Sequence, residues 1–460
     1  MSALFAEHAL LPHGFARDVL LKWDAAGALT EVTAGAKPNG PISRAAGPVL
    51  PGIANLHSHA FQRAMAGLTE YRVPGQNDFW SWRRLMYRFS LVLRPDELQS
   101  IATQLYIEML KCGYTSVCEF HYLHHDENGR PYANRLELCE RIIAAADDAG
   151  IGLTLLPALY EHSGFGAQPP LPEQRRFVTR PDQLLDMSAA LRLNHPEHDR
   201  LRYGIAPHSL RAVSPESLAR LIEGVSEIDN RAPIHIHVAE QAAEVTDSLA
   251  VLESRPVMWL LGHFGLDVRW CLVHATHMST EECVNVAASG ATVALCPSTE
   301  ANLGDGIFDT PGYLAAAGAW GIGSDSHASV SVSEELRWLE YAQRFLQRTR
   351  NVLTNIDAPR VAQHLFLEAA SGGAKASGRK IAGLARGQRA DLIVLDARHA
   401  NCSLSDPSAA LSGWIFGNHG GECVRDVMVG GRWVIEQGRH AREENALRGY
   451  IQARDALLER

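Results

Sequence analysis

The chain has 460 residues, with 43 lysines and arginines against 52 aspartates and glutamates, so its formal net charge is −9. Hydrophobic residues make up 46% and charged residues 21%, which is the composition of an ordinary globular protein. This acidic balance argues against a general binder of nucleic acid or of an anionic membrane. We expect no membrane segment either, because no apolar run approaches the roughly 20 residues that a spanning helix needs.

The cysteine pattern is that of a reducing compartment. The eight cysteines are irregularly spaced, and none forms a Cys-x-x-Cys pair. Such a pattern is typical of buried free thiols rather than of a disulfide framework. The first residues carry Glu7 and lack a basic segment followed by an apolar stretch, so we expect no secretory signal. The expected location is therefore the cytoplasm.

The predicted elements change character twice along the chain. Residues 1–50 contain short apolar runs separated by Gly, Pro and Asp, which indicates strands and turns. Strand patterns return at 390–397 and at 424–438, where Gly430 and Gly431 predict a turn between two strands. Between these ends, strand-like runs alternate with helical patterns. The strand-like runs are 49–57, 116–123, 153–160, 203–210, 234–240, 271–277, 292–297 and 321–327.

This order predicts an α/β fold with a parallel sheet, because strands and helices alternate. Eight such units fit a TIM-like (β/α)8 barrel over residues 51–375. The two β-rich ends, 1–50 and 376–460, are then expected to pair into one small domain. The segment 163–180 is rich in Pro and Gly, and we expect a long loop there that serves as a lid or an interface.

Several strand-like runs end in a residue that can bind a metal ion. His57 and His59 close the first run, and residues two apart on a strand share a face. His237, His274 and Asp325 close or follow later runs. In a barrel the carboxyl ends of the strands meet at the active-site face. Each residue alone has an ordinary structural explanation, but the set predicts a site for a divalent metal, Zn²⁺ above all.

Glu240 follows His237 by three residues, so we expect it just beyond the end of that strand. A carboxylate beside a metal-activated water can act as a proton shuttle. The alternative is that Glu240 caps the helix that follows. The neighbouring candidate ligands favour the catalytic interpretation.

These residues stand in segments that resemble the amidohydrolase superfamily, namely PGIANLHSH, HVAE, VHATH, CPSTEANLGDG, GSDSH and GLARGQRADLIVLD. The resemblance covers essentially the whole chain. It implies a metal-dependent hydrolase barrel with a small β-sandwich built from both termini. The chain is most similar to the mononuclear branch, because it offers His208 on the fourth strand and no clear bridging Lys. The resemblance thus implies a homodimer with one zinc ion per chain. The implied metal ligands are His57, His59, His237 and Asp325.

Longer segments narrow the resemblance to the formimidoylglutamate deiminases. These segments are HSHAFQRAMAG, DFWSWRRLMY, EFHYLHHD, APHSLRAV, CPSTEANLGDGIFD and GSDSHASVSVSEELRWLEYAQR. The resemblance implies hydrolysis of N-formimidoyl-L-glutamate to N-formyl-L-glutamate and ammonia, a step of histidine degradation. The expected partner is therefore a small dicarboxylate amidine.

An acidic chain can hold two carboxylates only where cations gather locally. Arg83 and Arg211 are the candidates, and Arg84 is an obvious rival to Arg83. A surface position for Arg83 or a loop ion pair for Arg211 is the ordinary alternative. The resemblance assigns substrate binding to both arginines and to three further residues, Gln62, Tyr122 and His208.

The expected chemistry divides proton transfer among three residues. His274 and Asp325 take a proton from the attacking water, and Glu240 delivers one to the amidine nitrogen. Whether His274 contacts the metal or only its water stays open.

The alternative functions are a deaminase of a purine, pterin or adenosyl compound, a hydrolase for a diacid of another length, and a non-catalytic scaffold. The two arginines argue against the first, and the complete ligand set argues against the last.

Overall fold

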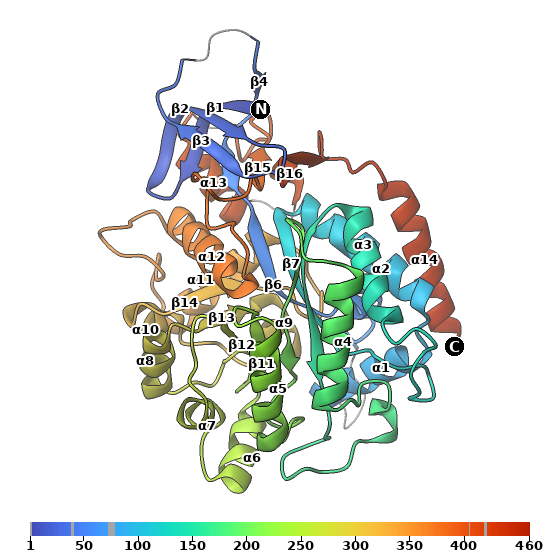
Figure 1. Ribbon diagram of the computed structural model, residues 1–460. Coiled ribbons are helices and arrows are strands. Elements are labelled where there is room, and N and C mark those ends of the chain that lie inside the picture. Colours follow the sequence, from blue (N-terminus) through green and yellow to red (C-terminus); the bar gives the residue numbers. More distant parts are fainter. Residues whose placement is uncertain (1, 38–40, 72–78, 404, 418–420) are drawn as a thin grey trace.

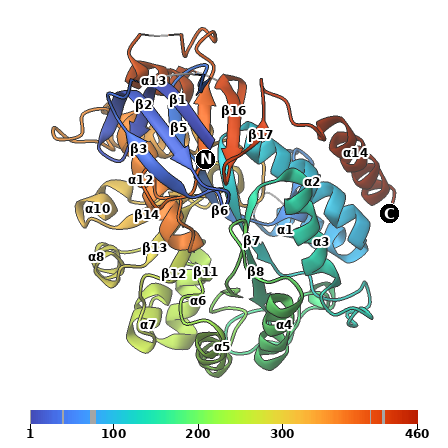
Figure 2. The same cartoon turned by 45° about the horizontal axis from the view of Figure 1, so that its top comes forward.

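The computed structural model describes residues 2–37, 41–71, 79–403, 405–417 and 421–460. A ring of parallel strands lies at its centre with helices around it, and a mostly β domain sits at one side (Figures 1 and 2). The strands of the ring are β6 (Ile53–Ser58), β7 (Tyr114–His121), β8 (Gly152–Leu159), β9 (Leu201–Tyr203), β10 (Ala206–Pro207), β11 (Ile234–Val238), β12 (Trp270–His274), β13 (Thr292–Leu295) and β14 (Ala319–Ile322).

Most helices lie between strands of the ring or follow the last of them. They are α1 (Phe79–Val92), α2 (Pro95–Lys111), α3 (Glu137–Ala149), α4 (Pro181–Asn194), α5 (Pro215–Ile228), α6 (Ala242–Leu252), α7 (Pro256–His263), α8 (Thr280–Ser289), α9 (Pro297–Leu303), α10 (Thr310–Ala315), α11 (Val332–Gln347), α12 (Val361–Ser377), α13 (Pro407–Gly417) and α14 (Glu443–Glu459). Short 3-10 helices are η1 (Ala60–Met65), η2 (Pro172–Gln174) and η3 (Gly421–Cys423).

Backbone pairing closes the ring into a barrel. One sheet has the order β10-β8-β7-β6, with β9 also paired to β8, and the other has the order β11-β12-β13-β14. Parallel bridges join the two sheets on one side at Ile205–Ile234 and Ser209–His237, and on the other side at Ser58–Asp325. With β9 and β10 taken as one interrupted strand, eight parallel strands surround the core. The predicted (β/α)8 fold class is thereby confirmed.

The local sequence explains where these elements begin and end. Every residue of β7, β8, β11 and β12 is buried, as expected for strands covered on both faces. The Ser214 and Ser279 side chains accept hydrogen bonds from the first turns of α5 and α8. Gly150 and Gly290 end α3 and α8 with left-handed backbone, which glycine adopts at little cost.

One predicted strand proves to be two. The run 49–57 divides at Gly52 into β5 (Val49–Pro51), which belongs to the terminal domain, and β6 of the barrel. A Cβ atom at Gly52 would lie 2.2 Å from the Thr115 hydroxyl oxygen, so the backbone passes very close to the neighbouring strand there. The apolar run is continuous in sequence, and nothing in its composition signals this change of sheet.

The terminal domain is built from both ends of the chain, as predicted. Its strands are β1 (Ser2–Leu11), β2 (Gly14–Trp23), β3 (Leu29–Thr33), β4 (Ser43–Arg44), β5, β15 (Leu392–Leu395), β16 (Val424–Val429) and β17 (Arg432–Ile435). They form one hydrogen-bonded sheet, ordered β17-β16-β15-β5-β1-β2-β3 with β4 beside β1. Where we expected a two-sheet sandwich, this single sheet encloses a core of its own that includes Leu21, Leu392 and Met428. Gly430 and Gly431 make the predicted turn, both with positive φ.

The chain beyond residue 376 also contains two helices that its strand-like texture did not suggest. Helix α13 packs on α11 and α12, and α14 packs on α2 at the side of the barrel (Figure 1). The C-terminal region thus contributes to both parts of the molecule. Within the described residues, no helix combines the length and apolar character needed to cross a membrane.

The close packing of α12 against β14 can be tested by substitution of a glycine. A Cβ at Gly372 would lie 1.8 Å from the main-chain oxygen of Trp320, whereas a Cβ at Gly262 of α7 would meet nothing within 4 Å. We expect Gly372→Ala to lower the free energy of unfolding by about 1–3 kcal/mol, because the obstacle is backbone and cannot rotate away. Gly262→Ala should be neutral or stabilising by up to about 1 kcal/mol. Urea unfolding of both variants checks this, and equal stabilities would contradict it.

Candidate active site

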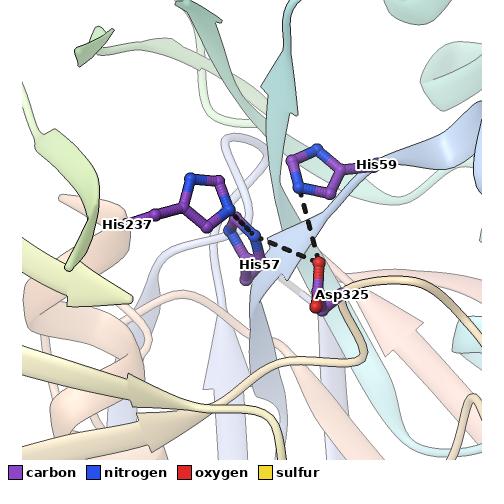
Figure 3. A group of neighbouring side chains, drawn as sticks. All are labelled: His57, His59, His237 and Asp325. Carbon is purple, nitrogen blue, oxygen red and sulfur yellow. Dashed lines mark hydrogen bonds and ion pairs between the residues drawn. The ribbon is translucent and has the colours of Figure 1, made fainter. Parts of the chain in front are cut away.

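Four candidate metal ligands converge at the carboxyl ends of the barrel strands (Figure 3). One donor atom from each of His57, His59, His237 and Asp325 lies within 4.8 Å of the other three, and all four residues are buried. The Nε2 atoms of His57 and His237 are 2.9 Å apart. The Asp325 Oδ1 atom lies 3.3 Å from His57 Nε2 and 3.4 Å from His59 Nε2.

The surroundings of these side chains suit a cation. His59 Nδ1 lies 2.9 Å from the Phe120 carbonyl oxygen and His237 Nδ1 lies 3.0 Å from that of His208, so both rings turn Nε2 toward the cluster. Burial, and then the neighbouring imidazoles, lower the pKa of His57 and of His237 well below the usual value. Neutral nitrogens beside a carboxylate are the donors that a divalent ion such as zinc takes, so the residues present fit a metal ion.

His274 lies beside this group without belonging to it. Its Nε2 atom is 3.8 Å from Asp325 Oδ2 and 3.9 Å from Glu240 Oε1, and its Nδ1 atom is 3.3 Å from Glu300 Oε1. Burial lowers the pKa of His274, but the Glu300 hydrogen bond and the charges of Glu240 and Asp325 outweigh it and raise the pKa to about 10. The imidazole is thus held between three carboxylates with its proton-bearing edge toward the site.

Strained backbone coincides with the strand ends that carry these residues. His274, Asp325 and Ala239, the last directly before Glu240, all have positive φ values, between 44° and 63°. Such conformations cost non-glycine residues about 1–3 kcal/mol each and persist only where the surroundings hold them. Barrel packing therefore fixes the direction in which the side chains of His274 and Asp325 leave the strands.

A pocket of about 560 Å³, including the space that opens to solvent, lies over the cluster. All five predicted substrate-binding residues line it, together with Glu240, His274, Asp325 and two of the histidine ligands. The remaining wall is largely aromatic and apolar. It consists of Trp82, Met86, Tyr87, Tyr160, Phe177 and Leu303. The structure thus brings every predicted site residue to one place, with His57 just beneath the pocket surface.

Arg83 rather than Arg84 faces this pocket. Arg83 is half-buried on α1, donates a hydrogen bond to the Tyr160 hydroxyl at 3.2 Å and stacks over the Tyr87 ring. Gln174 donates to both tyrosine hydroxyls at 2.8 Å, which fixes the two rings. Arg84 is exposed and lies outside the pocket wall. Adjacent residues on a helix point in different directions, so only one of the two arginines can face the pocket. The orientation of α1 selects Arg83.

Arg211 approaches the pocket from the loop after β10. Its guanidinium lies 3.4 Å from Glu240 Oε2 and 3.8 Å from Glu244 Oε2. Glu244 also accepts hydrogen bonds from the backbone nitrogens of Ala239 and Glu240, at 3.1 and 3.3 Å. Glu240 therefore points toward the site, and it is Glu244 that caps this turn.

Three acidic residues of the site were missed from the sequence. Glu244 positions Glu240, and Glu300 accepts the Cys296 backbone N–H at 2.9 Å while it holds His274. Burial and the charge of Glu240 raise the pKa of Asp305, which is 4% exposed, to about 9. Glu300 and Asp305 lie within the segment CPSTEANLGDG, so that motif was the available signal.

Comparisons with known proteins place the chain in a family. Residues 49–434 match the amidohydrolase family, and residues 1–42 match the N-terminal domain of formimidoylglutamate deiminase HutF. The chain therefore belongs to the amidohydrolase family and is a hydrolase acting on C–N bonds. Membership of this family implies a metal ion at the barrel site.

Within the family, the chain is similar to individual relatives along its whole length. The formimidoylglutamate deiminase of Pseudomonas aeruginosa is 50% identical over 462 residues, which cover 100% of both chains. The crystal structure of an amidohydrolase from Brucella melitensis superposes with a TM-score of 0.93 at 44% identity, again over 100% of both chains. A zinc-bound adenosine deaminase from Xanthomonas campestris shares the fold, with a TM-score of 0.82 at 20% identity over 100% of this chain and 98% of that one.

The ligand geometry predicts how metal content responds to substitution. We expect His237→Ala to lower the metal content by one ion per chain after dialysis, because the variant loses one of four converging donors. His208→Gln is the matched control, since its main-chain oxygen still orients His237. Elemental analysis of both proteins measures the outcome. Equal metal content in His237→Ala and the parent, or loss in the control, would contradict the assignment.

Proposed function

We propose that the protein hydrolyses N-formimidoyl-L-glutamate to N-formyl-L-glutamate and ammonia, in histidine degradation. The observation that carries the proposal is one pocket with two arginines, Arg83 and Arg211, beside the acid-rich cluster at the strand ends. That combination fits a substrate with two carboxylates and one cationic amidine. The full-length similarity to a formimidoylglutamate deiminase supports the same substrate.

We further propose one zinc ion per chain, held by the side chains of His57, His59, His237 and Asp325. When bound, such an ion supplies Lewis-acid activation of a water molecule. Three imidazoles and one carboxylate are suitable ligands for zinc. The zinc in the Xanthomonas campestris deaminase, which has the same fold, is consistent with this choice.

The remaining side chains divide the proton transfers. Water adds to the formimidoyl carbon, and Asp325 accepts the first proton that it gives up. His274, which the neighbouring carboxylates keep protonated, orients the water beside Asp325. His274 Nε2 lies 3.8 Å from Asp325 Oδ2, so the two groups interact through their charges rather than through a direct hydrogen bond. Glu240 pairs with the amidine as a carboxylate, takes the proton that remains on the added oxygen and passes it to the terminal nitrogen. The bond between that nitrogen and carbon then breaks, ammonia leaves, and the formyl group remains.

The clamp for the two carboxylates uses residues from separate elements. Arg83 comes from α1, Arg211 and His208 follow β10, and Gln62 comes from η1. Gln62 donates a hydrogen bond of 2.7 Å to the Tyr122 hydroxyl, which in turn faces Met86. We assign these four residues, together with Tyr122, to substrate binding. A neutral purine offers no carboxylate to Arg83 or Arg211, which disfavours the alternative deaminase.

We also propose a cytoplasmic location and a homodimeric state for the enzyme. All eight cysteines are free thiols, seven of them buried, which suits a cytoplasmic protein. A homodimer rests on the family resemblance alone.

Ammonia release is the direct test. We expect fast turnover of N-formimidoyl-L-glutamate by the zinc-loaded protein and little or none of its aspartate analogue, guanine or adenosine. Glu240→Gln is the control that ties turnover to this site, because it keeps the clamp and the ligands but removes the proton donor. Turnover of a purine instead would keep the metal chemistry and refute the substrate.

The two neighbouring arginines give a matched pair of variants. We expect Arg83→Met to lower kcat/KM for N-formimidoyl-L-glutamate at least about 30-fold, since losing a buried charged partner costs roughly 2–5 kcal/mol. Arg84→Met, at an exposed position, should stay within a few-fold of the parent. Steady-state kinetics of both variants decide the matter. The clamp assignment fails if the two variants are equally impaired or equally active.

A further inference from the structure

A second group of potential metal ligands lies in the terminal β domain, apart from the barrel pocket. Single donor atoms of His399, Cys402 and Cys423 lie within 4.8 Å of one another. Cys402 is 1% and Cys423 0% exposed, whereas the side chain of His399 is 24% exposed. None of the three lines the pocket over the active site. The proposed hydrolysis makes no use of them.

Main-chain hydrogen bonds hold the two segments that carry these residues. The strands β15 and β16 pair at Leu395–Val424, and the Asp396 backbone N–H donates to the Cys423 carbonyl at 2.8 Å. The chain then turns directly after β15, where the Cys402 N–H donates to the His399 carbonyl at 2.9 Å. The three side chains are therefore placed by the fold before any ligand arrives. Ligands on such fixed elements lose little entropy on binding.

The contacts among these three side chains place nitrogen and sulfur lone pairs close to one another. The Cys423 sulfur lies 3.2 Å from His399 Nδ1 and within 4.8 Å of the Cys402 sulfur. His399 Nδ1 also accepts the Asn401 backbone N–H at 3.2 Å, so this nitrogen carries a lone pair rather than a proton. One lone pair on Nδ1 can serve only one of these two contacts well.

We propose that His399, Cys402 and Cys423 form a second metal site, one that takes a thiophilic divalent ion such as Zn²⁺. The ion would replace the thiol protons, which are released to solvent as it binds. Zinc bound tetrahedrally to nitrogen and sulfur keeps the two atoms roughly 3.5 Å apart, close to the observed 3.2 Å. His399 and Cys402 come from one turn, and Cys423 ends η3 directly before β16, so the donors come from two segments that the fold holds side by side.

The side chain of His399 is 24% exposed, so an ion would reach the two buried sulfurs beside this ring, and water from the same side would serve as fourth ligand. A bound ion would cross-link the turn after β15 to the start of β16. The site stabilises the terminal domain and takes no part in hydrolysis, so it goes beyond the proposed function and can be tested without any substrate.

Cobalt substitution distinguishes this site from the one in the barrel. The four barrel donors contain no sulfur, so thiolate-to-cobalt charge-transfer absorption reports a cysteine site. We expect the protein, stripped of metal and reloaded with Co²⁺, to bind two ions per chain and to show this absorption. Cys402→Ser and Cys423→Ser should abolish it and reduce the bound cobalt to one ion. His399→Gln, which removes the imidazole donor and keeps both sulfurs, should weaken it.

Cys139→Ser is the matched control, because Cys139 belongs to another group of histidine and cysteine side chains, with His121 and His124. It should keep the absorption. No thiolate absorption in the parent protein, or absorption that survives both Cys402→Ser and His399→Gln, would overturn the proposal. So would a count of six free thiols instead of eight in unreduced protein, if Cys402→Ser then shows seven, since the two sulfurs would form a disulfide.

Discussion

The closure of the barrel between its first and last strands is the constraint on which the site depends. The Asp325 backbone N–H donates to the His57 carbonyl at 2.9 Å, and the His59 N–H donates to the Asp325 carbonyl at 3.3 Å. These two hydrogen bonds join residues almost 270 positions apart in the sequence. The same bonds that close the ring bring a carboxylate beside two imidazoles, so a barrel that failed to close would also lose the proposed metal site.

Closure also brings together the opposite charges that compensate the buried carboxylates of the site. Asp325, Glu240 and Glu300 are each at most 6% exposed, and an isolated buried carboxylate is strongly unfavourable. His274 lies within 3.9 Å of all three, and its raised pKa is the response to them. A cation at the histidine ligands would add a second compensating charge. The cost of burial is thus offset inside the cluster, and the surrounding aromatic wall can remain apolar.

Site residues that stand at strand ends could be predicted from the sequence. Features that arise from contacts between distant segments were missed. His57, His59 and His237 could be recognised because each closes an apolar run whose end must face the active-site side of a barrel. Arg83 was chosen from the family resemblance, and the residue pattern itself left Arg84 as a rival, since the choice depends on the rotation of one helix. The strand break at Gly52 was hidden for a similar reason. It is imposed by the close approach of Thr115, which the local composition does not reveal.

The same distinction applies to the acidic residues. Glu240 was found because it follows a histidine at a fixed spacing, whereas Glu244 and Glu300 act only through side chains that the fold brings to them. Helices α13 and α14 were missed because the region beyond residue 376 was judged from its strands, although α13 lies between β15 and β16 and α14 follows β17. Periodicity identified the elements of the barrel, but it could not say which surface the C-terminal helices would cover.

The pairing of Arg211 with Glu240 shows how substrate charge and catalytic charge fit together. In the structure the guanidinium and the carboxylate lie 3.4 Å apart, so each neutralises the other in a half-buried setting. The proposed substrate carries a carboxylate for Arg211 and a cationic amidine for Glu240. Exchanging one internal ion pair for two pairs with the substrate leaves no buried charge alone. A neutral ligand would break the internal pair without replacing it. The selectivity for a zwitterionic amidine thus follows from the charge balance of the site itself, before any contact to the chain length of the substrate is considered.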